Sequence, residues 1–208
     1  SGVTRPRPVT TTRRIPSLSR RWQSSRVIHG GAGPRNMARA RDALAGAAGP
    51  PQSARMTLRP ARPDEADGLT ALCLRSKAYW GYGADFMAQA APHLAIPPAL
   101  IDARRVFVTE TPSARPAAVM AVSPPDADGC AELVLLFVDP PEMGKGHGSA
   151  LLAHALRLAK SDGAVALRVL SDPNAAPFYR AKGVARIGAA PSDAIPGRSL
   201  PRLEWRLG

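Results

Sequence analysis

The 208-residue sequence lacks the patterns that mark several common classes of protein. It has two cysteines, Cys73 and Cys130, in apolar patterns without metal-ligand spacing, which favours a reduced, cytoplasmic protein over a disulfide scaffold. No apolar run approaches the roughly 18 residues that a membrane-spanning helix needs, so we expect no membrane partner. The four histidines are scattered and none forms a metal-binding motif, so we predict no metal.

Acidic residues and lysines are almost missing from the first part of the chain. Residues 1–55 hold eleven arginines, no lysine and one acid, Asp42, and so carry +10 of the net charge of +12. The remaining 17 basic and 15 acidic residues nearly balance. Because the segment is rich in Arg, Pro, Ser, Thr and Gly, it cannot bury enough apolar surface to fold. We therefore predict a disordered basic arm at 1–55 and one domain at 56–208.

Three interpretations of the arm remain open. Its composition resembles that of an organelle transit peptide, and it could also be a nucleic-acid-binding arm. The third interpretation, which we favour, is sequence upstream of a start at Met56. Heavy use of Arg, Ala, Gly and Pro beside few Lys suggests a GC-rich bacterial genome, which argues against a transit peptide. Arginines without interleaved aromatic residues give weak, salt-sensitive affinity, so we do not expect a nucleic-acid partner.

The first half of the domain changes from helical to strand-like patterns. The residues predict a strand at 57–61, a helix from Pro63 toward Trp80, a short helix at 84–91 ended by prolines, and strands at 106–110, 117–122 and 130–138. Because short turns join the last three strands, we expect an antiparallel meander.

A strand–helix–strand unit follows the meander. We expect a helix carrying Leu151 to Ala159, a buried strand at 164–170, a short helix carrying Phe178 and Tyr179, and last strands at 184–187 and 203–207. The crossover implies parallel pairing of the strands that flank the first of these helices. A long loop containing Arg198 separates the last two strands.

A glycine-rich turn joins the third meander strand to the crossover helix. Gly144, Gly146 and Gly148 remove the β-carbons that would keep a ligand away from main-chain N–H groups at a helix N-terminus, so the turn predicts a phosphate site. It is not a Walker A loop, because Lys145 is followed by Gly146. It is not the dinucleotide fingerprint either, because Ser149 stands at the third glycine position.

The turn resembles the pyrophosphate loop of the Gcn-related N-acetyltransferase (GNAT) superfamily, Gln/Arg-x-x-Gly-x-Gly/Ala. Gly146 and Gly148 take its small positions, while Met143 stands where Gln or Arg is usual. Residues 174–183 resemble the superfamily's Asn-x-x-Ala/Pro-x-x-Phe-Tyr-x-x-x-Gly segment in slightly compressed form. The resemblance covers Met56 to about Leu207. It implies an α/β fold whose mixed, mostly antiparallel sheet of six to seven strands is flanked by about four helices and splayed between the fourth and fifth strands.

The resemblance also implies how acetyl-CoA binds as cosubstrate. Main-chain groups at Leu136, Phe137 and Val138 pair with the pantetheine, and a free N–H near Val138 polarises the thioester carbonyl. The pyrophosphate and CoA contacts are expected from Met143, Gly144, Lys145, Gly146, His147, Gly148, Ser149 and Asn174. We expect Lys145 to add a point charge or to be a solvated loop lysine. His147 is expected to act through its main chain, with its side chain pointing outward.

Tyr179 matches the superfamily's usual general acid, although a buried core tyrosine is the alternative. Glu132, a carboxylate in an otherwise apolar strand, is our candidate general base; a structural salt bridge, for example to Arg168, is the alternative. Trp80, Tyr82 and Arg198 are candidates for the acceptor pocket, and a packed corner is the alternative for the two aromatic residues. Arg198 hints at a carboxylate or phosphate on the substrate.

The expected function is transfer of an acetyl group from acetyl-CoA to a primary amine by direct attack in a ternary complex. The alternatives are a CoA-binding module without catalysis and a nucleic-acid-binding protein that uses the arm. Residues 76–82 and 195–201 are similar to a bacterial subgroup of the superfamily, but this similarity does not identify the acceptor. We expect a monomer or a homodimer.

Overall fold

One mixed β-sheet forms the centre of the protein in a computed structural model, which describes residues 26–27 and 56–208. Its strands lie in the order β2 (Thr57–Pro60), β3 (Val106–Glu110), β4 (Pro116–Val122), β5 (Cys130–Val138), β6 (Ala166–Leu170), β8 (Ser199–Arg206) and β7 (Ala185–Pro191). Neighbours in this order are antiparallel except β5 and β6, which are parallel. The predicted α/β fold with a mostly antiparallel sheet is confirmed.

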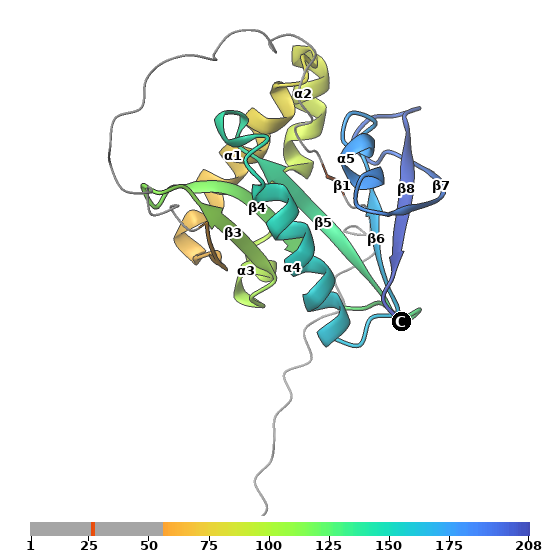
Figure 1. Cartoon of the computed structure of the whole chain (residues 1–208). Coiled ribbons are helices and arrows are strands. Elements are labelled where there is room, and N and C mark those ends of the chain that lie inside the picture. Colours follow the sequence, from red (N-terminus) through yellow and green to blue (C-terminus); the bar gives the residue numbers. More distant parts are fainter. Residues whose placement is uncertain (1–25, 28–55) are drawn as a thin grey trace, which may run out of the picture.

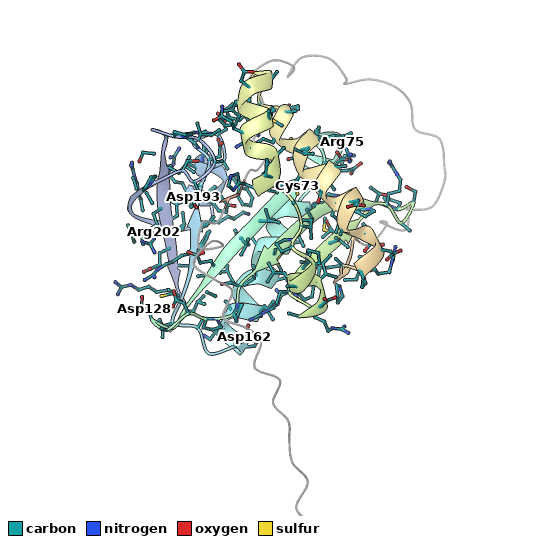
Figure 2. All side chains as sticks on the ribbon, turned by 180° about the vertical axis from the view of Figure 1, so that it is seen from behind. Cys73, Arg75, Asp128, Asp162, Asp193 and Arg202 are labelled. Carbon is teal, nitrogen blue, oxygen red and sulfur yellow. The ribbon has the colours of Figure 1, made fainter. Side chains whose placement is uncertain are left out.

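Helices cover both faces of the sheet (Figure 1). The described residues form α1 (Ala66–Ala78), α2 (Ala84–Ala90), α3 (Pro98–Asp102), α4 (His147–Ser161) and α5 (Ala176–Arg180). The long helix α4 packs on one face, against β4 and β5, and α1 packs on the other, as the reverse view shows with Cys73 and Arg75 on α1 (Figure 2). None of the helices in the described part is long and apolar enough to cross a membrane.

Prolines stand at the start of helical segments at both ends of the α1–α3 region. A short 3₁₀ turn at Pro63–Glu65 leads into α1, as the proline and acidic residues predicted. Pro97 and Pro98 were predicted only to break the helical pattern, whereas α3 begins at Pro98. A proline at the first helical position lacks only an N–H that the helix does not use, so it can start a helix as well as end one.

The two helical layers enclose two apolar cores. The α4 side contains Leu151, Leu152, Ala155 and Ala159, the residues that the helical spacing had assigned to one face. The α1 side contains Leu69, Leu72 and Cys73, together with Leu94, Ile96 and Leu100 from the segment before and within α3. Each fully buried leucine contributes about 1.5–3 kcal/mol, so these two cores hold the sheet in place between its helices. Cys73 and Cys130 are both free thiols.

A β-bulge shapes β5, the last strand of the meander. Ala121 pairs with Leu135 but Val122 pairs with Leu133, so Val134 is an extra residue in β5. A bulge bends its strand and increases its local twist. Two residues before Val134, at Glu132 opposite Arg168, the pairing of β5 with β6 ends. The two parallel strands then diverge into the predicted gap (Figure 1).

The gap between β5 and β6 holds a short strand from the basic arm. β1 (Arg26–Val27) pairs in parallel with Leu135 and Leu136 and contacts both β5 and β6 (Figure 1). No strand was predicted in the arm. The expectation of disorder for the rest of it, residues 1–25 and 28–55, lies outside the described residues. The gap therefore accepts an extended chain that pairs with β5.

Candidate active site

The glycine-rich turn runs directly into the N-terminus of α4. Gly144 has φ +81° and Gly146 has φ +91°, left-handed conformations that glycine adopts without strain. Gly146 is the N-cap, and no side chain caps the helix there. The first main-chain bond of α4 is from the N–H of Ala150 to the carbonyl of Gly146 at 3.0 Å, so the N–H groups before it are not used within the helix. The turn thus has the geometry of an anion site.

The charged and apolar side chains of the turn serve the protein itself. Lys145 is exposed, and its Nζ lies 3.0 Å from Oε2 of Glu142. Met143 is partly buried and packs against the core on the α4 side. Neither side chain therefore stands free in front of the helix, and main-chain groups are the donors that the turn offers to a phosphate.

The prediction that the His147 side chain points outward is wrong. His147 is buried, with Nδ1 2.9 Å from Oγ1 of Thr109 on β3 and Nε2 3.6 Å from Oε2 of Glu142. Burial lowers the pKa of His147 although the Glu142 carboxylate opposes this, so the imidazole is neutral at pH 7. The ring therefore joins the turn to the sheet. A glycine on either side suggested an exposed loop, and Thr109 lies too far away in the sequence to be recognised as a partner.

The edge of β5 that faces the gap offers main-chain groups from alternate residues. The N–H of Asp139 donates to the carbonyl of Ala117 on β4 at 2.8 Å. Since hydrogen-bonded pairs alternate along an antiparallel ladder, Phe137 also bonds to β4, whereas Leu136 and Val138 face the gap. Of the three residues predicted to pair with pantetheine, Leu136 and Val138 have the required orientation and Phe137 does not.

Tyr179, the predicted general acid, lies on α5 and is fully buried. Its ring packs edge-on against Phe178 and Trp205, with centroids 5.1 and 5.6 Å away. Burial raises the pKa of Tyr179 well above 10, so the phenol is protonated throughout the neutral range. Tyr179 is therefore both a core residue and a protonated phenol, so the two roles considered from the sequence are compatible.

Glu132 lies at the point where β5 and β6 separate. Ala131 and Leu133 belong to the core on the α4 side, so alternation places Glu132 on the opposite face of the sheet. The same alternation places Arg168 and Leu170 of β6 on that face, because Leu167 and Val169 belong to the α4-side core. Arg168 donates from Nε to Oε2 of Glu204 at 2.9 Å and so forms a salt bridge with β8.

A cavity opens on this face of the sheet, between α1, α2 and the β7–β8 loop. It is open to solvent: its empty space is about 340 Å³ with the solvent at its mouth included, and the centres of water molecules fit in about 20 Å³ of it. Its lining residues are Lys77, Phe86, Ala90, Leu94, Leu170, Asp172, Ser192, Ala194, Ile195, Arg198 and Leu200. Leu170 ends β6, one of the two strands that border the gap, so cavity and gap share this strand. Of the predicted acceptor residues, Arg198 lines the cavity. Trp80 does not; its indole packs against the α1-side core.

Five residues beside the cavity, Lys77, Tyr82, Asp172, Asn174 and Arg198, form one hydrogen-bonded group that we call the polar cluster. Asp172 is its centre: Oδ2 accepts from Lys77 at 3.0 Å, from Arg198 at 2.9 Å and from the Tyr82 hydroxyl at 2.8 Å, and Oδ1 accepts from the Asn174 N–H at 2.9 Å. Asn174 also donates from Nδ2 to the Tyr82 hydroxyl at 3.0 Å. Asn174, predicted as a CoA contact, and Tyr82, predicted as a residue of the acceptor pocket, thus belong to the same hydrogen-bonded cluster.

Electrostatics hold Asp172 in its charged form. Burial alone would raise the pKa of this carboxyl, but the Lys77 ammonium, with hydrogen bonds from Asn174, Lys77 and Tyr82, outweighs burial and brings the pKa below its usual value. Burial and the nearby carboxylate together raise the pKa of Tyr82, which is therefore a neutral donor. The cluster fixes the start of α5 and the β7–β8 loop against α1.

Asp172 was not predicted from the sequence, although its spacing from Tyr179 could have identified it. The segment Asn-x-x-Ala/Pro-x-x-Phe-Tyr begins seven positions before its tyrosine, and Asp172 lies seven positions before Tyr179. In this register Ala175 takes the Ala/Pro position and no compression is needed. Aligning the asparagine with Asn174 instead moved the segment's first position by two residues.

Comparison with known proteins agrees with this geometry. The sequence profile of the acetyltransferase (GNAT) family matches residues 77–184, which is more than half of the chain. No curated protein sequence matches significantly. A GCN5-related N-acetyltransferase from Rhodopseudomonas palustris is similar in structure, with a TM-score of 0.59, 22% identity, and coverage of 73% of this chain and 96% of that one.

Two further similar structures were solved with a cofactor. PaiA N-acetyltransferase from Thermoplasma acidophilum, in complex with coenzyme A, has a TM-score of 0.56 and 16% identity, and the match covers 73% of this chain and 99% of that one. YncA from Salmonella typhimurium, with acetyl-CoA, has a TM-score of 0.54 and 19% identity, covering 74% and 95%. Similarity at these identities supports the fold, and the family profile covers the glycine-rich turn, Glu132 and Tyr179 but not the β7–β8 loop with Arg198. The chain belongs to the acetyltransferase (GNAT) family.

Proposed function

We propose that this protein is an acetyl-CoA-dependent N-acetyltransferase that acts on a primary amine by direct attack in a ternary complex. The observation that carries the proposal is that β5, which borders the gap, leads through the glycine-rich turn to an N-terminus of α4 that no side chain caps. An extended strand already pairs with β5 in that gap, which supports the binding of an equally extended pantetheine there. The complexes of two similar structures with coenzyme A and with acetyl-CoA support the same cosubstrate.

The protein's own groups have distinct roles in this proposal. Main-chain groups of Leu136 and Val138 pair with the pantetheine amides, and the N–H groups from Gly144 to Ser149 bind the pyrophosphate. Acetyl-CoA supplies an activated acetyl group as a thioester. A neutral amine forms a bond to the acetyl carbon while the carbon–sulfur bond breaks. The proton lost by the amine goes to Glu132, directly or through water, and Tyr179 protonates the leaving thiolate.

The proposal is tested with the full chain and acetyl-CoA. We expect isothermal titration calorimetry to show binding of CoA, and a thiol-release assay to show acetylation of at least one amine in a panel of amino acids, amino-acid amides, polyamines and peptides. Binding without turnover across the panel would support a CoA-binding module instead. Absence of CoA binding would contradict both functions.

Substitution of Gly146 by alanine is expected to weaken CoA binding at least about tenfold. Its φ of +91° costs a residue with a β-carbon about 1–2 kcal/mol. The new β-carbon meets no protein atom closer than 3.9 Å, so it projects into the open space from which a phosphate approaches. Calorimetry measures the change in Kd.

Gly163→Ala is the matched control for this variant. Gly163 has φ +79°, no atom within 4 Å of its built β-carbon, and a position after the other end of α4. It should therefore lose a similar amount of stability while binding CoA as the wild type does. Equal CoA affinities of the two variants would show that the pyrophosphate does not contact the turn at Gly146.

Removal of the basic arm is expected to strengthen CoA binding, because β1 pairs with the edge of β5 that the pantetheine requires. A chain that starts at Met56 should have a Kd for CoA that is a few-fold lower, on the scale of one or two main-chain hydrogen bonds. Titration of CoA into both chains measures this. Unchanged affinity would mean that β1 does not compete, and weaker affinity would mean that the arm belongs to the CoA site.

A further inference from the structure

The cavity beside the polar cluster is lined by both aliphatic and charged residues. Six aliphatic residues line it: Ala90, Leu94, Leu170, Ala194, Ile195 and Leu200. The charged side chains in the lining are Lys77, Asp172 and Arg198, two cations and one anion. Asp172 pairs with both cations, so positive charges outnumber negative ones among these lining residues. An excess of positive charge beside apolar walls favours a ligand that carries a negative charge.

Arg198 is the cation that remains available to such a ligand. The hydrogen bonds defined for its guanidinium, to the Tyr82 hydroxyl at 3.0 Å and to Asp172 at 2.9 Å, both start from Nη2. The plane lies near two aromatic rings, with Cζ 4.9 Å from the Phe86 centroid and 5.3 Å from that of Tyr82. These two rings stack at 4.1 Å and hold the guanidinium in one orientation. A fixed guanidinium with further N–H donors suits a carboxylate, which it can bind through two parallel hydrogen bonds.

Asp172 is not available to bind a cationic group on the acceptor. Its two oxygens already accept hydrogen bonds from Lys77, Tyr82, Arg198 and the Asn174 main chain. A carboxylate has about four lone-pair sites, so this one is saturated. An acceptor with additional ammonium groups would meet two cations and no free carboxylate among the lining residues. The cavity therefore disfavours polyamines and other polycationic amines.

We infer that the acceptor is a primary amine that bears one carboxylate and a small apolar side chain, as an apolar α-amino acid does, and that Arg198 binds its carboxylate. This inference rests on the proposed function and specifies its substrate class. A carboxylate meets a guanidinium through two parallel hydrogen bonds and adds one negative charge to the two cations and one anion of the lining, whereas a phosphate monoester adds nearly two. The aliphatic walls receive the side chain. The amine then lies toward Leu170 at the end of β6, because this strand also borders the gap in which the thioester is proposed to bind.

The first test compares L-leucine with L-leucinamide, which keeps the amine and the side chain but lacks the carboxylate. With the full chain and saturating acetyl-CoA, kcat/KM for leucine should exceed that for leucinamide by at least about tenfold, the effect of one charge-assisted bidentate contact. Spermidine should be a poorer acceptor than either. Equal or higher kcat/KM for leucinamide or spermidine would overturn the inference.

The second test removes the guanidinium. Arg198→Gln should lower kcat/KM for leucine by about 10- to 100-fold and leave that for leucinamide nearly unchanged. Arg206→Gln is the control, because it removes a positive charge from the end of β8, the strand that follows Arg198, where the side chain is 92% exposed. An equal loss for both substrates in Arg198→Gln would indicate a structural role and overturn the inference. The wild-type comparison does not depend on how well this variant folds.

Calorimetry separates failure of this inference from failure of the proposed function. If the protein binds CoA and acetylates other amines, but neither binds nor acetylates leucine or other apolar amino acids, the substrate class is wrong and the proposed function stands. If it does not bind CoA, both are wrong. Binding of leucine to the CoA-loaded protein, reduced at least about tenfold by Arg198→Gln, would support the inference independently of turnover.

Discussion

Replacing Tyr179 with phenylalanine is expected to lower kcat by about 10²-fold or more, with the KM for acetyl-CoA nearly unchanged. The phenol is the proton donor in the proposed reaction, and its loss leaves the thiolate to depart unprotonated. Phenylalanine keeps the ring that packs against Phe178 and Trp205, so the fold should persist. Steady-state kinetics and thermal unfolding of the same samples measure the two effects separately.

Tyr79→Phe is the control, since Tyr79 is half-exposed and lies at the end of α1, outside the gap. Unchanged kcat in Tyr179→Phe would show that Tyr179 is a core residue only, which is the alternative that the sequence also allowed. Because burial raises the pKa of Tyr179 well above 10, its deprotonation should not limit the rate up to about pH 10. A loss of activity at lower alkaline pH that disappears in the phenylalanine variant would contradict this.

Replacing Asp172 with alanine is expected to destabilise the folded protein by about 3–5 kcal/mol, the range for removing one partner of a buried ion pair. Lys77 and Asp172 are both at least 90% buried, so the ammonium would lose its carboxylate where water cannot replace it. Arg198 and Tyr82 would lose the same acceptor. Urea unfolding at pH 7 measures the difference, and a change below about 1 kcal/mol would contradict this account.

Asp193→Ala is the matched control, because Asp193 is an exposed carboxylate in the β7–β8 loop (Figure 2). Its loss should change the free energy of unfolding by less than about 0.5 kcal/mol. The effect of Asp172 should also depend on pH. Its pKa is lower in the folded than in the unfolded state, so its stabilisation is present above about pH 4 and is lost as the pH falls through the folded pKa. The difference between wild type and Asp172→Ala should shrink accordingly.

Local patterns predicted most of the secondary structure, because they reflect which face of each element is buried. The strands of the meander and α4 were placed within a few residues, and α1 and α2 within about one turn. The β7–β8 hairpin is longer than predicted, extending to Pro191 and starting again at Ser199. Most of β7 is exposed on both faces, so its residues carry no alternation by which a strand is recognised.

The candidate site was predicted less evenly. The glycine turn was found because its main-chain conformation depends on residue type at Gly144 and Gly146. The partners of His147, the orientation of Phe137 and the central role of Asp172 were not found. Each depends on contacts between segments that are distant in the sequence. His147 bonds to Thr109 on β3, Phe137 pairs with β4, and Asp172 bonds to Lys77 on α1. Sequence spacing carried a signal only for Asp172.

The sequence by itself determined the fold, the family resemblance and the glycine-rich turn, because helical period, strand alternation and positive φ depend on residues that are close together in the chain. Only the tertiary structure decided what surrounds the cavity beside the polar cluster. Lys77, Asp172 and Arg198 come from three separate segments, and a charge that looks solvated in the sequence becomes a buried partner when these segments meet. The bulge at Val134 and the end of pairing at Glu132 likewise depend on the register between strands, and they set where the gap opens.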